Sequence, residues 1–400
     1  MTEENMSKLE ELIEQYCPDG VEYYKIKDVY KRIKVTPITA GKMKEIATPD
    51  GSVRIFAGGK TVIDANEKDI PNANITRVPA VLIQSRGVID AVYYDKPFTF
   101  KNEMWAYTTF NQKSVKYLYY ILKSNIQTFR DAASGMGALP QISLGVTEEF
   151  EIPVPPLPVQ EEIVRILDNF TELQAELQAE LQKRKQQYNY YLDNLLNFNN
   201  INRGGYQAEV RWMKLKDIGK VCMCKRILKS QTSSSGDVPF FKIGTFGGNA
   251  DAYISQALFN EYKAKYSYPQ KGEVLISAAG TIGRTIVFDG TPSYFQDSNI
   301  VWLKHDESIV LNSYLRYCYA LNPWVVSTGG TIARLYNDNI LEATIPVPSL
   351  ANQQRIVSIL DRFDTLTTDL TQGLPAEIEK RRQQYEYYRD KLLTFKRKGA

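Results

Sequence analysis

The 400-residue sequence contains four cysteines and one histidine, and this scarcity excludes much chemistry. Four scattered cysteines cannot build a disulfide framework. Only Cys222 and Cys224 lie close together, and no second pair supplies the four ligands of a zinc site. The one histidine, His305, stands among charged residues and is expected at the surface. Catalysis by a Ser-His-Asp or Cys-His set is therefore disfavoured. We therefore expect buried or idle thiols and no metal.

The chain also lacks an excess of either charge and any long hydrophobic run. Its 49 basic and 46 acidic residues give a net charge of +3, which excludes a polycationic nucleic-acid condenser but allows local basic faces. No segment approaches the roughly 18–20 apolar residues of a membrane span. The acidic start, residues 1–5, has no signal-peptide character. With 43% hydrophobic residues, the sequence predicts a cytoplasmic protein of two or three domains.

What the sequence does contain is a long-range internal repeat. Residues 152–170 return as 345–363 with twelve of nineteen positions identical, and 183–198 return as 380–395 with eleven of sixteen identical. The intervening segments match more faintly. A spacing of 193 to 197 residues is too long for a solenoid unit and indicates a duplicated half-protein. The expected parts are two variable regions, each followed by a similar helical region: 1–151, 152–199, 200–344 and 345–400.

The two similar regions are predicted to be long amphipathic helices. After the prolines of 153–158, apolar residues recur every three or four positions up to Phe198, which predicts a helix of roughly 38 residues. In the second copy, Gly373-Leu374-Pro375 predicts a stop and a restart. Residues 152–198 carry four basic and seven acidic side chains (−3), and 345–400 carry ten and seven (+3), which favours pairing as a coiled coil.

The variable regions are predicted to be α+β modules. Short β-branched or aromatic runs at 80–83, 91–94 and 285–288 indicate strands, and 115–129 and 309–320 indicate one helix in each region. The fold class is therefore α+β, with two pseudo-symmetric domains separated by a long antiparallel coiled coil of the two repeated helical regions.

These motifs together resemble the specificity subunit of type I restriction-modification systems, over nearly the whole chain. The resemblance rests on Ile-Pro-Val-Pro-x-Leu-x-x-Gln-x-x-Ile-Val-x-Ile-Leu-Asp, beginning at Ile152 and Ile345, and on Lys-Arg-x-Gln-Gln-Tyr-x-Tyr-Tyr, beginning at Lys183 and Lys380. Residues 17–21 and 373–378 also resemble that family. The resemblance implies two target recognition domains, each reading half of a split site in double-stranded DNA.

The resemblance further implies the partners. The helices would form the spacer and dock two methyltransferase subunits, and restriction (motor-nuclease) subunits would join them. The chain itself would be non-catalytic and hold no cofactor, with S-adenosylmethionine, ATP and Mg²⁺ in the partners. Since consecutive tyrosines cannot all face one helical seam, Tyr190 and Tyr387 are expected to face a partner.

Two alternatives remain open at this point. One is a metal-dependent nuclease built on Asp251, Glu261 and Lys263, a pattern that also arises by chance in charged sequences. The other is a free-standing DNA-binding adaptor. A phosphate-binding P-loop is excluded because Gly59-Lys60-Thr61 has Arg54 at the first glycine position.

Candidate DNA contacts lie at matched glycine-rich turns, where bare backbone approaches phosphate closely. In the first region they are Lys60, Ser85, Arg86, Gly87 and Gln141; in the second they are Lys242, Thr245, Gly280, Thr281, Arg284 and Arg334.

The first helix also contains a tandem four-residue repeat, Glu-Leu-Gln-Ala, over residues 172–182. Each unit would change the helix length by about 6 Å. The repeat is therefore predicted to set the gap between the two half-sites, as the resemblance also implies.

Overall fold

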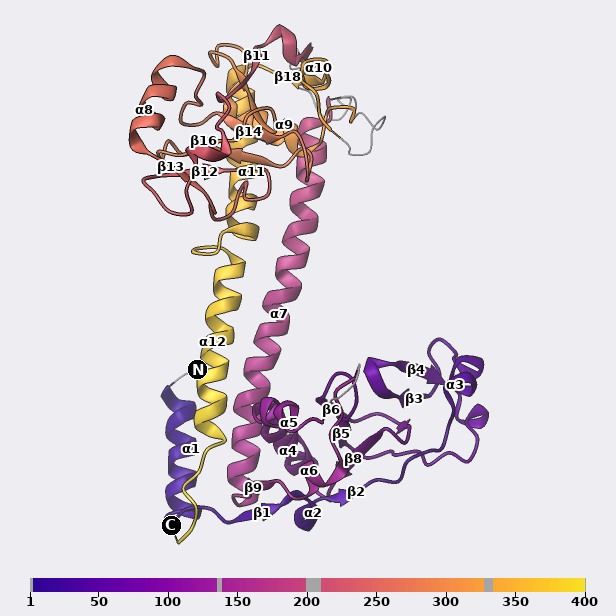
Figure 1. Ribbon diagram of the computed structural model, residues 1–400. Coiled ribbons are helices and arrows are strands. Elements are labelled where there is room, and N and C mark those ends of the chain that lie inside the picture. The colour runs from indigo at the N-terminus through magenta and orange to yellow at the C-terminus, as the bar shows by residue number, and fades with distance from the viewer. Residues whose placement is uncertain (1–2, 135–138, 199–209, 327–333, 400) are drawn as a thin grey trace. The chain divides into compact units, whose positions relative to one another are not determined.

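The computed structural model describes residues 3–134, 139–198, 210–326 and 334–399 (Figure 1). Contacts divide the chain into two compact units. Unit 1 comprises Met1–Gln178 and Glu377–Ala400, and unit 2 comprises Ala179–Ala376. Each unit therefore joins one globular region to parts of both helical regions. The division at residues 151, 199 and 344 stays a prediction.

The globular part of unit 1 is built from short strands and helices. In chain order its elements are α1 Glu3–Tyr16, β1 Tyr23–Lys25, α2 Ile26–Val29, β2 Lys31–Arg32, α3 Ala40–Ile46, β3 Val53–Phe56, η1 Gly58–Lys60, β4 Val62–Ala65, η2 Glu67–Asp69, β5 Ala80–Gln84, β6 Asp90–Tyr94, β7 Phe98–Phe100, β8 Met104–Thr108, α4 Gln112–Ser124, α5 Ile126–Asp131, α6 Leu144–Glu148 and β9 Glu151–Pro153.

Three sheets organise these strands: the antiparallel pair β1-β9, the four-stranded β2-β8-β5-β6, and the three-stranded β4-β3-β7, in which β3 and β7 run parallel. Strand β5 is buried along its whole length because it lies inside its sheet and is covered by the core. The predicted strands at 80–83 and 91–94 are confirmed as β5 and β6.

Unit 2 repeats this plan. Its elements are β10 Arg211–Lys214, η4 Leu215–Asp217, β11 Lys220–Met223, η5 Lys229–Gln231, β12 Val238–Phe241, β13 Tyr253–Ile254, α8 Gln256–Lys265, β14 Val274–Ser277, β15 Thr285–Val287, β16 Tyr294–Phe295, β17 Ile300–Lys304, α9 Asn312–Ala320, α10 Asn337–Leu341 and β18 Thr344–Val347. Its sheets are β10-β18, β11-β17-β14-β15 and β13-β12-β16, the last again with a parallel pair, β12 and β16. The predicted α+β class and the duplication of the globular module are confirmed.

The repeated regions are helical, as expected. Helix α7 runs without interruption over Leu157–Leu196, 40 residues. The second copy divides into α11 (Leu350–Thr368) and α12 (Leu374–Leu392), as the Gly-Leu-Pro sequence predicts. A Cβ atom at Gly373 would collide with the carbonyl oxygen of Thr365, so only glycine fits this break.

Aromatic stacking joins α7 to the second helical copy within each unit. In unit 1 the rings of Phe170 (α7) and Tyr388 (α12) stack 5.7 Å apart. In unit 2 the rings of Tyr191 (α7) and Phe363 (α11) stack 5.1 Å apart. Phe170 and Phe363 are repeat equivalents, as are Tyr191 and Tyr388. The early part of each copy therefore packs on the late part of the other, which is the antiparallel coiled coil that was predicted.

The boundaries of some expected helices differ. The helix predicted at 115–129 is two helices, α4 and α5, because Asn125 leaves helical geometry and its amide caps the carbonyl of Ile121 at 2.8 Å. The helix predicted at 309–320 begins at Asn312. Across the described ranges, no helix is both long enough and apolar enough to cross a bilayer.

Candidate nucleic-acid interface

Three loops of unit 1 converge at one edge of its sheets. They are the β3–β4 loop containing Gly58, the β7–β8 turn ending at Glu103, and the β5–β6 loop beginning at Ser85. The amide of Gly58 donates to Glu103 Oε1 at 3.3 Å, and the Ser85 hydroxyl donates to the Glu103 carbonyl at 2.5 Å. We call this surface, with the residues that join it at 139–142, edge 1.

The segment at 139–142 completes edge 1 through main-chain bonds. The amide of Gly87 donates to the carbonyl of Pro140 at 2.9 Å, and that of Ile142 donates to the carbonyl of Ser85 at 2.9 Å. Arg86 and Gln141 form a β-bridge. Gly87 has a φ of 79°, a left-handed conformation that glycine adopts without strain. The structure therefore brings the predicted residues of the first region together.

Their side chains are not equally available. Arg86 and Gln141 are exposed, and among the described residues the Arg86 guanidinium has no ion-pair or hydrogen-bond partner. Ser85 is only 1% exposed, so its hydroxyl stabilises the turn and cannot present itself to a ligand. Lys60 ends the 3₁₀ turn of the β3–β4 loop. The neighbouring glycine turn around Gly137 lies outside the described residues.

Unit 2 builds an equivalent edge, edge 2, from corresponding loops. The amide of Gln296 donates to the carbonyl of Phe241 at 2.9 Å, as that of Lys101 does to Phe56 at 3.0 Å in unit 1. The amide of Leu335 donates to the carbonyl of Ala278 at 2.9 Å, the counterpart of the Ile142–Ser85 bond. Gly280, with a φ of 65°, occupies the position of Gly87. The framework is thus shared.

Several polar groups of edge 2, in side chains and in the main chain, are held by neighbours. Lys242 pairs with Asp251 at 2.8 Å, and its amide donates to Thr245 Oγ1 at 3.1 Å. The carbonyl of Thr281 accepts a hydrogen bond from the Ser277 hydroxyl.

The two arginines of edge 2 brace loops. Arg284 Nη2 donates to the carbonyl of Gly247 at 3.1 Å, and a Cβ at Gly247 would lie 2.6 Å from that nitrogen. Arg334 Nη2 donates to the carbonyl of Ser298 at 2.9 Å. The residues at 329–331, expected beside Arg334, lie outside the described part. The predicted residues of the second region are therefore brought together, and hydrogen bonds and an ion pair to neighbouring groups hold several of them.

Sequence reasoning missed the β7–β8 turn, because no glycine marks it. Lys101 Nζ lies 3.0 Å from Glu103 Oε1 in this turn. Burial raises the pKa of the Glu103 carboxyl, but hydrogen bonds from Lys101 and the Gly58 amide outweigh it and hold the pKa below its usual range. Edge 1 therefore presents a fixed carboxylate as well as the arginine at position 86, which has no partner among the described residues.

A second missed feature is a pair of identical ionic clamps. Glu149 accepts hydrogen bonds from Lys25 at 2.7 Å and from Lys27. Its counterpart Glu342 accepts from Lys214 and Lys216, each at 2.6 Å. In both units the two lysine hydrogen bonds lower the pKa of the carboxyl to about 2. Each clamp ties the start of a globular part to the residues that lead into its helix.

The three residues of the nuclease alternative each contact different neighbours. Asp251 pairs with Lys242, and Glu261 pairs with Lys265 at 2.9 Å. Lys263 lies over the rings of Phe259 and Tyr268, with its Nζ 5.0 Å from the latter centroid. Within the described ranges no group of three metal-ligating residues is assembled. These contacts do not form the metal-nuclease arrangement that the spacing suggested.

The cysteines, the histidine and the two exposed tyrosines lie in different environments. All four cysteines are buried, as expected. His305 is half-buried, with Nε2 2.8 Å from the carbonyl oxygen of Val310, and its neighbours Lys304 and Asp306 are exposed. Tyr190 and Tyr387 face solvent, 63% and 64% exposed. Their expected partner contact stays a prediction.

The chain matches a known protein family over most of its length. The family model for the type I restriction modification DNA specificity domain matches twice, at residues 18–187 and 207–380. A 256-residue alignment is 56% identical to a putative type I restriction enzyme specificity subunit of Haemophilus influenzae. It covers 62% of this chain and 64% of that protein, so it spans slightly less than two thirds of the relative.

Two further relatives agree. The EcoR124I/EcoR124II specificity subunit of Escherichia coli is 34% identical in an alignment 306 residues long, which covers 71% of this chain and 72% of that one. The crystal structure of a type I restriction-modification S subunit from M. genitalium superposes with a TM-score of 0.57. It covers 93% of this chain and 95% of that chain at 16% identity, so it supports the fold alone. The chain belongs to the family of type I restriction-modification specificity subunits, a family that is not itself catalytic.

Proposed function

We propose that this chain recognises a bipartite DNA sequence, with edge 1 reading one half-site and edge 2 reading the other. The observation that carries the proposal is the pair of edges: corresponding loops, held by corresponding main-chain hydrogen bonds, present different side chains. Gln141 in edge 1 stands where Arg334 stands in edge 2. A common framework with different side chains suits two copies of one module that read different bases.

Edge 1 has the chemistry for both kinds of DNA contact. Arg86 can pair with a phosphate or with the O6 and N7 atoms of guanine, and the Gln141 amide can pair with adenine. The Glu103 carboxylate repels phosphate but can accept a hydrogen bond from the amino group of cytosine. In edge 2, Arg284 and Arg334 already donate to carbonyl groups, so their remaining N–H groups would point along fixed directions.

We further propose that the helices set the gap between the half-sites and dock the partners. The tandem repeat at 172–182 lies inside the uninterrupted helix α7, so a change in repeat number would change helix length. The two equivalent helical surfaces, with Tyr190 and Tyr387, would bind two methyltransferase subunits about a pseudo-two-fold axis. Restriction subunits would join them in the cytoplasm. S-adenosylmethionine, ATP and Mg²⁺ would be held by these partners.

The direct experiment is methylome sequencing of a host that expresses the complete system, with and without this chain. The expected result is one bipartite methylated motif that disappears with the chain. As the internal control, replacing residues 1–151 with the corresponding region of a relative should change one half of the motif and leave the other half intact. A motif that changes in both halves, or an undivided motif, would contradict the assignment of one half-site to each edge.

A further inference from the structure

The loop between β11 and β12 carries three exposed cations, Lys225, Arg226 and Lys229. Serines, a threonine and a glutamine follow at residues 230–235. Neither lysine makes an ion pair with another residue that the structure describes. Arg226 Nε lies 4.0 Å from Asp297 Oδ2, and the arginine side chain is 74% exposed. The loop therefore presents positive charge that its neighbours neutralise only in part.

Hydrogen bonds hold the backbone of this loop in place. The amide of Leu228 donates to Gln231 Oε1 at 2.9 Å, and Gln231 Nε2 donates to the hydroxyl of Tyr262 at 3.3 Å. Ser233 and Tyr253 of β13 exchange two main-chain hydrogen bonds, at 3.0 and 2.9 Å. Because the loop is already ordered, a ligand that binds its cations loses little conformational entropy.

Helix α8 adds an aromatic ring to the same surface. It packs on the β13-β12-β16 sheet through Phe259 (Figure 1). Tyr266, directly after the helix, is 43% exposed, and Lys225 Nζ lies 5.2 Å from the centroid of its ring. The ring attracts one side of the ammonium group and leaves N–H donors on the other side for an anion. We call Lys225, Arg226, Lys229 and Tyr266 the basic flank.

The basic flank adjoins edge 2 at the turn between β16 and β17. Asp297, which faces Arg226, stands in this turn between Gln296 and Ser298, and both of these neighbours belong to the bracing of edge 2. One helical turn of DNA is about 34 Å long. A duplex bound at edge 2 would therefore extend past this turn and bring its backbone to the basic flank.

The arrangement of a lysine on a tyrosine ring at this place is particular to unit 2. Strands β2 and β11 correspond, and Thr36 and Pro37 of unit 1 stand at the positions of Lys225 and Arg226. Thr36 is fully buried. After β4, unit 1 has the three-residue turn η2 where unit 2 has α8 after β13, so no counterpart of Tyr266 is present there.

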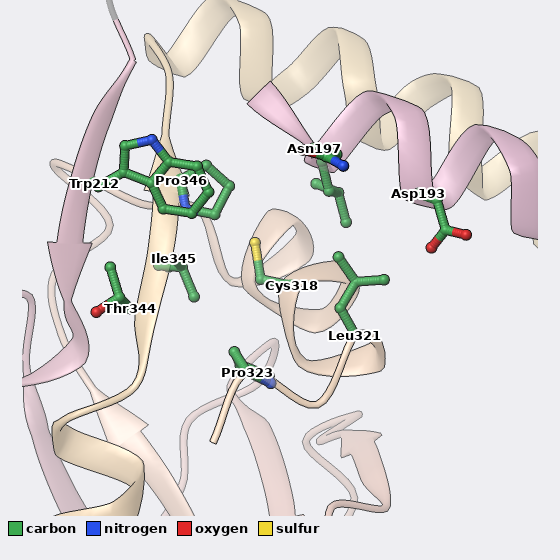
Figure 2. Close-up of a pocket in the computed structure, with 10 residues that line it drawn as sticks. Asp193, Asn197, Trp212, Cys318, Leu321, Pro323, Thr344, Ile345 and Pro346 are labelled. Carbon is green, nitrogen blue, oxygen red and sulfur yellow. The ribbon is translucent and has the colours of Figure 1, made fainter. Parts of the chain in front are cut away.

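The pocket of unit 2 beside β10 has a different chemistry. Its volume is 410 Å³, and Trp212, Cys318 and Asp193 are among the residues that line it (Figure 2). The described residues of its lining include no lysine or arginine, and the carboxylate of Asp193 would repel a phosphate. The basic flank therefore suits an anion, and this pocket does not.

We propose that the basic flank binds backbone phosphates of the DNA beside the half-site read by edge 2, so that unit 2 also holds the duplex through a contact without sequence information. The inference rests on the proposed function of edge 2 and deepens it. Unneutralised positive charge and continuity with edge 2 identify the occupant as DNA. The polar side chains at 230–235 add donors for phosphate oxygens.

The test is a salt titration of DNA binding by the assembled complex with the double variant Lys225→Gln, Lys229→Gln, on one duplex that contains the methylated motif and one that lacks it. The slope of log K against log salt concentration should fall by about two phosphate-contact units on both duplexes. Between about 50 and 200 mM salt, the parent should therefore lose roughly tenfold more affinity than the variant.

The matched control is Lys220→Gln, Lys304→Gln, which removes two exposed lysines at the paired outer ends of β11 and β17. It should leave the slope unchanged. All four positions are exposed, so both variants should fold, and an unchanged thermal melting curve checks this.

The two duplexes separate this proposal from half-site recognition. The ratio of their affinities should be the same in parent and variant, because phosphate contacts act on any sequence. An unchanged slope with an intact preference for the motif would overturn the basic flank and leave the function of edge 2 standing. A parent complex without that preference would contradict the function of edge 2, and the slope on the motif-free duplex would still decide on the flank. A double variant that no longer joins the complex would overturn the proposal and assign this surface to a partner protein.

Discussion

The residues of the two edges divide into those that hold the loops and those that face outward. Main-chain bonds such as Ile142 to Ser85 and Leu335 to Ala278 are kept in both units. The outward positions differ: the exposed Arg86, unpaired within the described part of the chain, corresponds to Ala279 in unit 2. The exposed Gln141 corresponds to Arg334, which donates to Ser298. The loops can therefore stay in place while the presented chemistry changes.

Replacing Arg86 with alanine is expected to weaken DNA binding and to lower the slope of log K against log salt concentration by about one phosphate-contact unit. When Arg334→Ala is added, the slope should fall by about two phosphate-contact units in total. Lys265→Ala removes the same charge from an ion pair on α8 and serves as the control. The measurement is a salt titration of DNA binding by the assembled complex. An unchanged slope in the Arg86 variant would remove this residue from the interface.

The ionic clamps predict a pH dependence of stability. Because the folded pKa of Glu149 and of Glu342 is depressed to about 2, each clamp stabilises the fold above the ordinary carboxyl pKa. That contribution disappears as the pH falls from about 4.5 towards 2.

Glu149→Gln should therefore lower the melting temperature at pH 7, and the difference from the parent should shrink below about pH 4.5. Glu342→Gln is the matched variant and should show the same profile. Melting curves at several pH values provide the test. A difference that stays constant down to pH 3 would show that the carboxylate charge does not stabilise the fold.

At the scale of elements, stacked aromatic pairs hold the helices together. Basic residues of α12 find acidic partners on the same helix, as Arg381 does with Glu377 at 2.7 Å. The contact between copies is instead made by Phe170 with Tyr388, and by Phe363 with Tyr191. The opposite net charges of the two regions are thus less important for the contact than the repeated aromatic positions.

Phe170→Ala should destabilise unit 1 by about 3–5 kcal/mol, because a nearly buried ring (6% exposed) is removed and leaves a cavity. Phe363→Ala, its half-buried counterpart, should cost less. Hydrogen exchange should become faster in α12 for the first variant and in α11 for the second. Equal exchange changes in both helices for either variant would contradict this assignment of contacts.

The sequence predicted the long elements better than the short ones. The apolar stripe of α7 and the break at Gly373 are periodic or steric signals that one sequence carries. Strands β2, β13 and β16 have two residues each, too few to show alternation. Helix α1 escaped prediction although Leu9, Leu12 and Ile13 contribute to the core of unit 1.

The candidate site was predictable only in part. Glycines marked the turns, so Gly87 and Gly280 were found together with their neighbours. The bracing of Gly247 by Arg284 joins residues 37 positions apart, and no local pattern predicts such a bond. The fixed carboxylate of Glu103 was missed because no glycine marks its turn and because its partner Gly58 lies 45 residues away in the sequence.

At the scale of the whole molecule, the main feature is the duplication. Two matches to one specificity domain, two equivalent edges and two equivalent helical surfaces support our proposal that the chain performs one recognition task twice. The helical regions differ in one respect. Phe170 precedes Lys183 by thirteen residues, whereas Phe363 precedes Lys380 by seventeen, with the break at Gly373 between them. Only α7 is a continuous helix over this stretch.

The most direct test of the central claim is methylome sequencing of hosts carrying the parent chain and a deletion of residues 176–179. Removing four residues shortens α7 by about 6 Å, which is roughly one to two base pairs at about 3.4 Å each. The predicted motif keeps both half-sites and has a gap shorter by one or two base pairs, less if the break at Gly373 bends to compensate. An active enzyme with an unchanged gap, or with altered half-sites, would contradict the account.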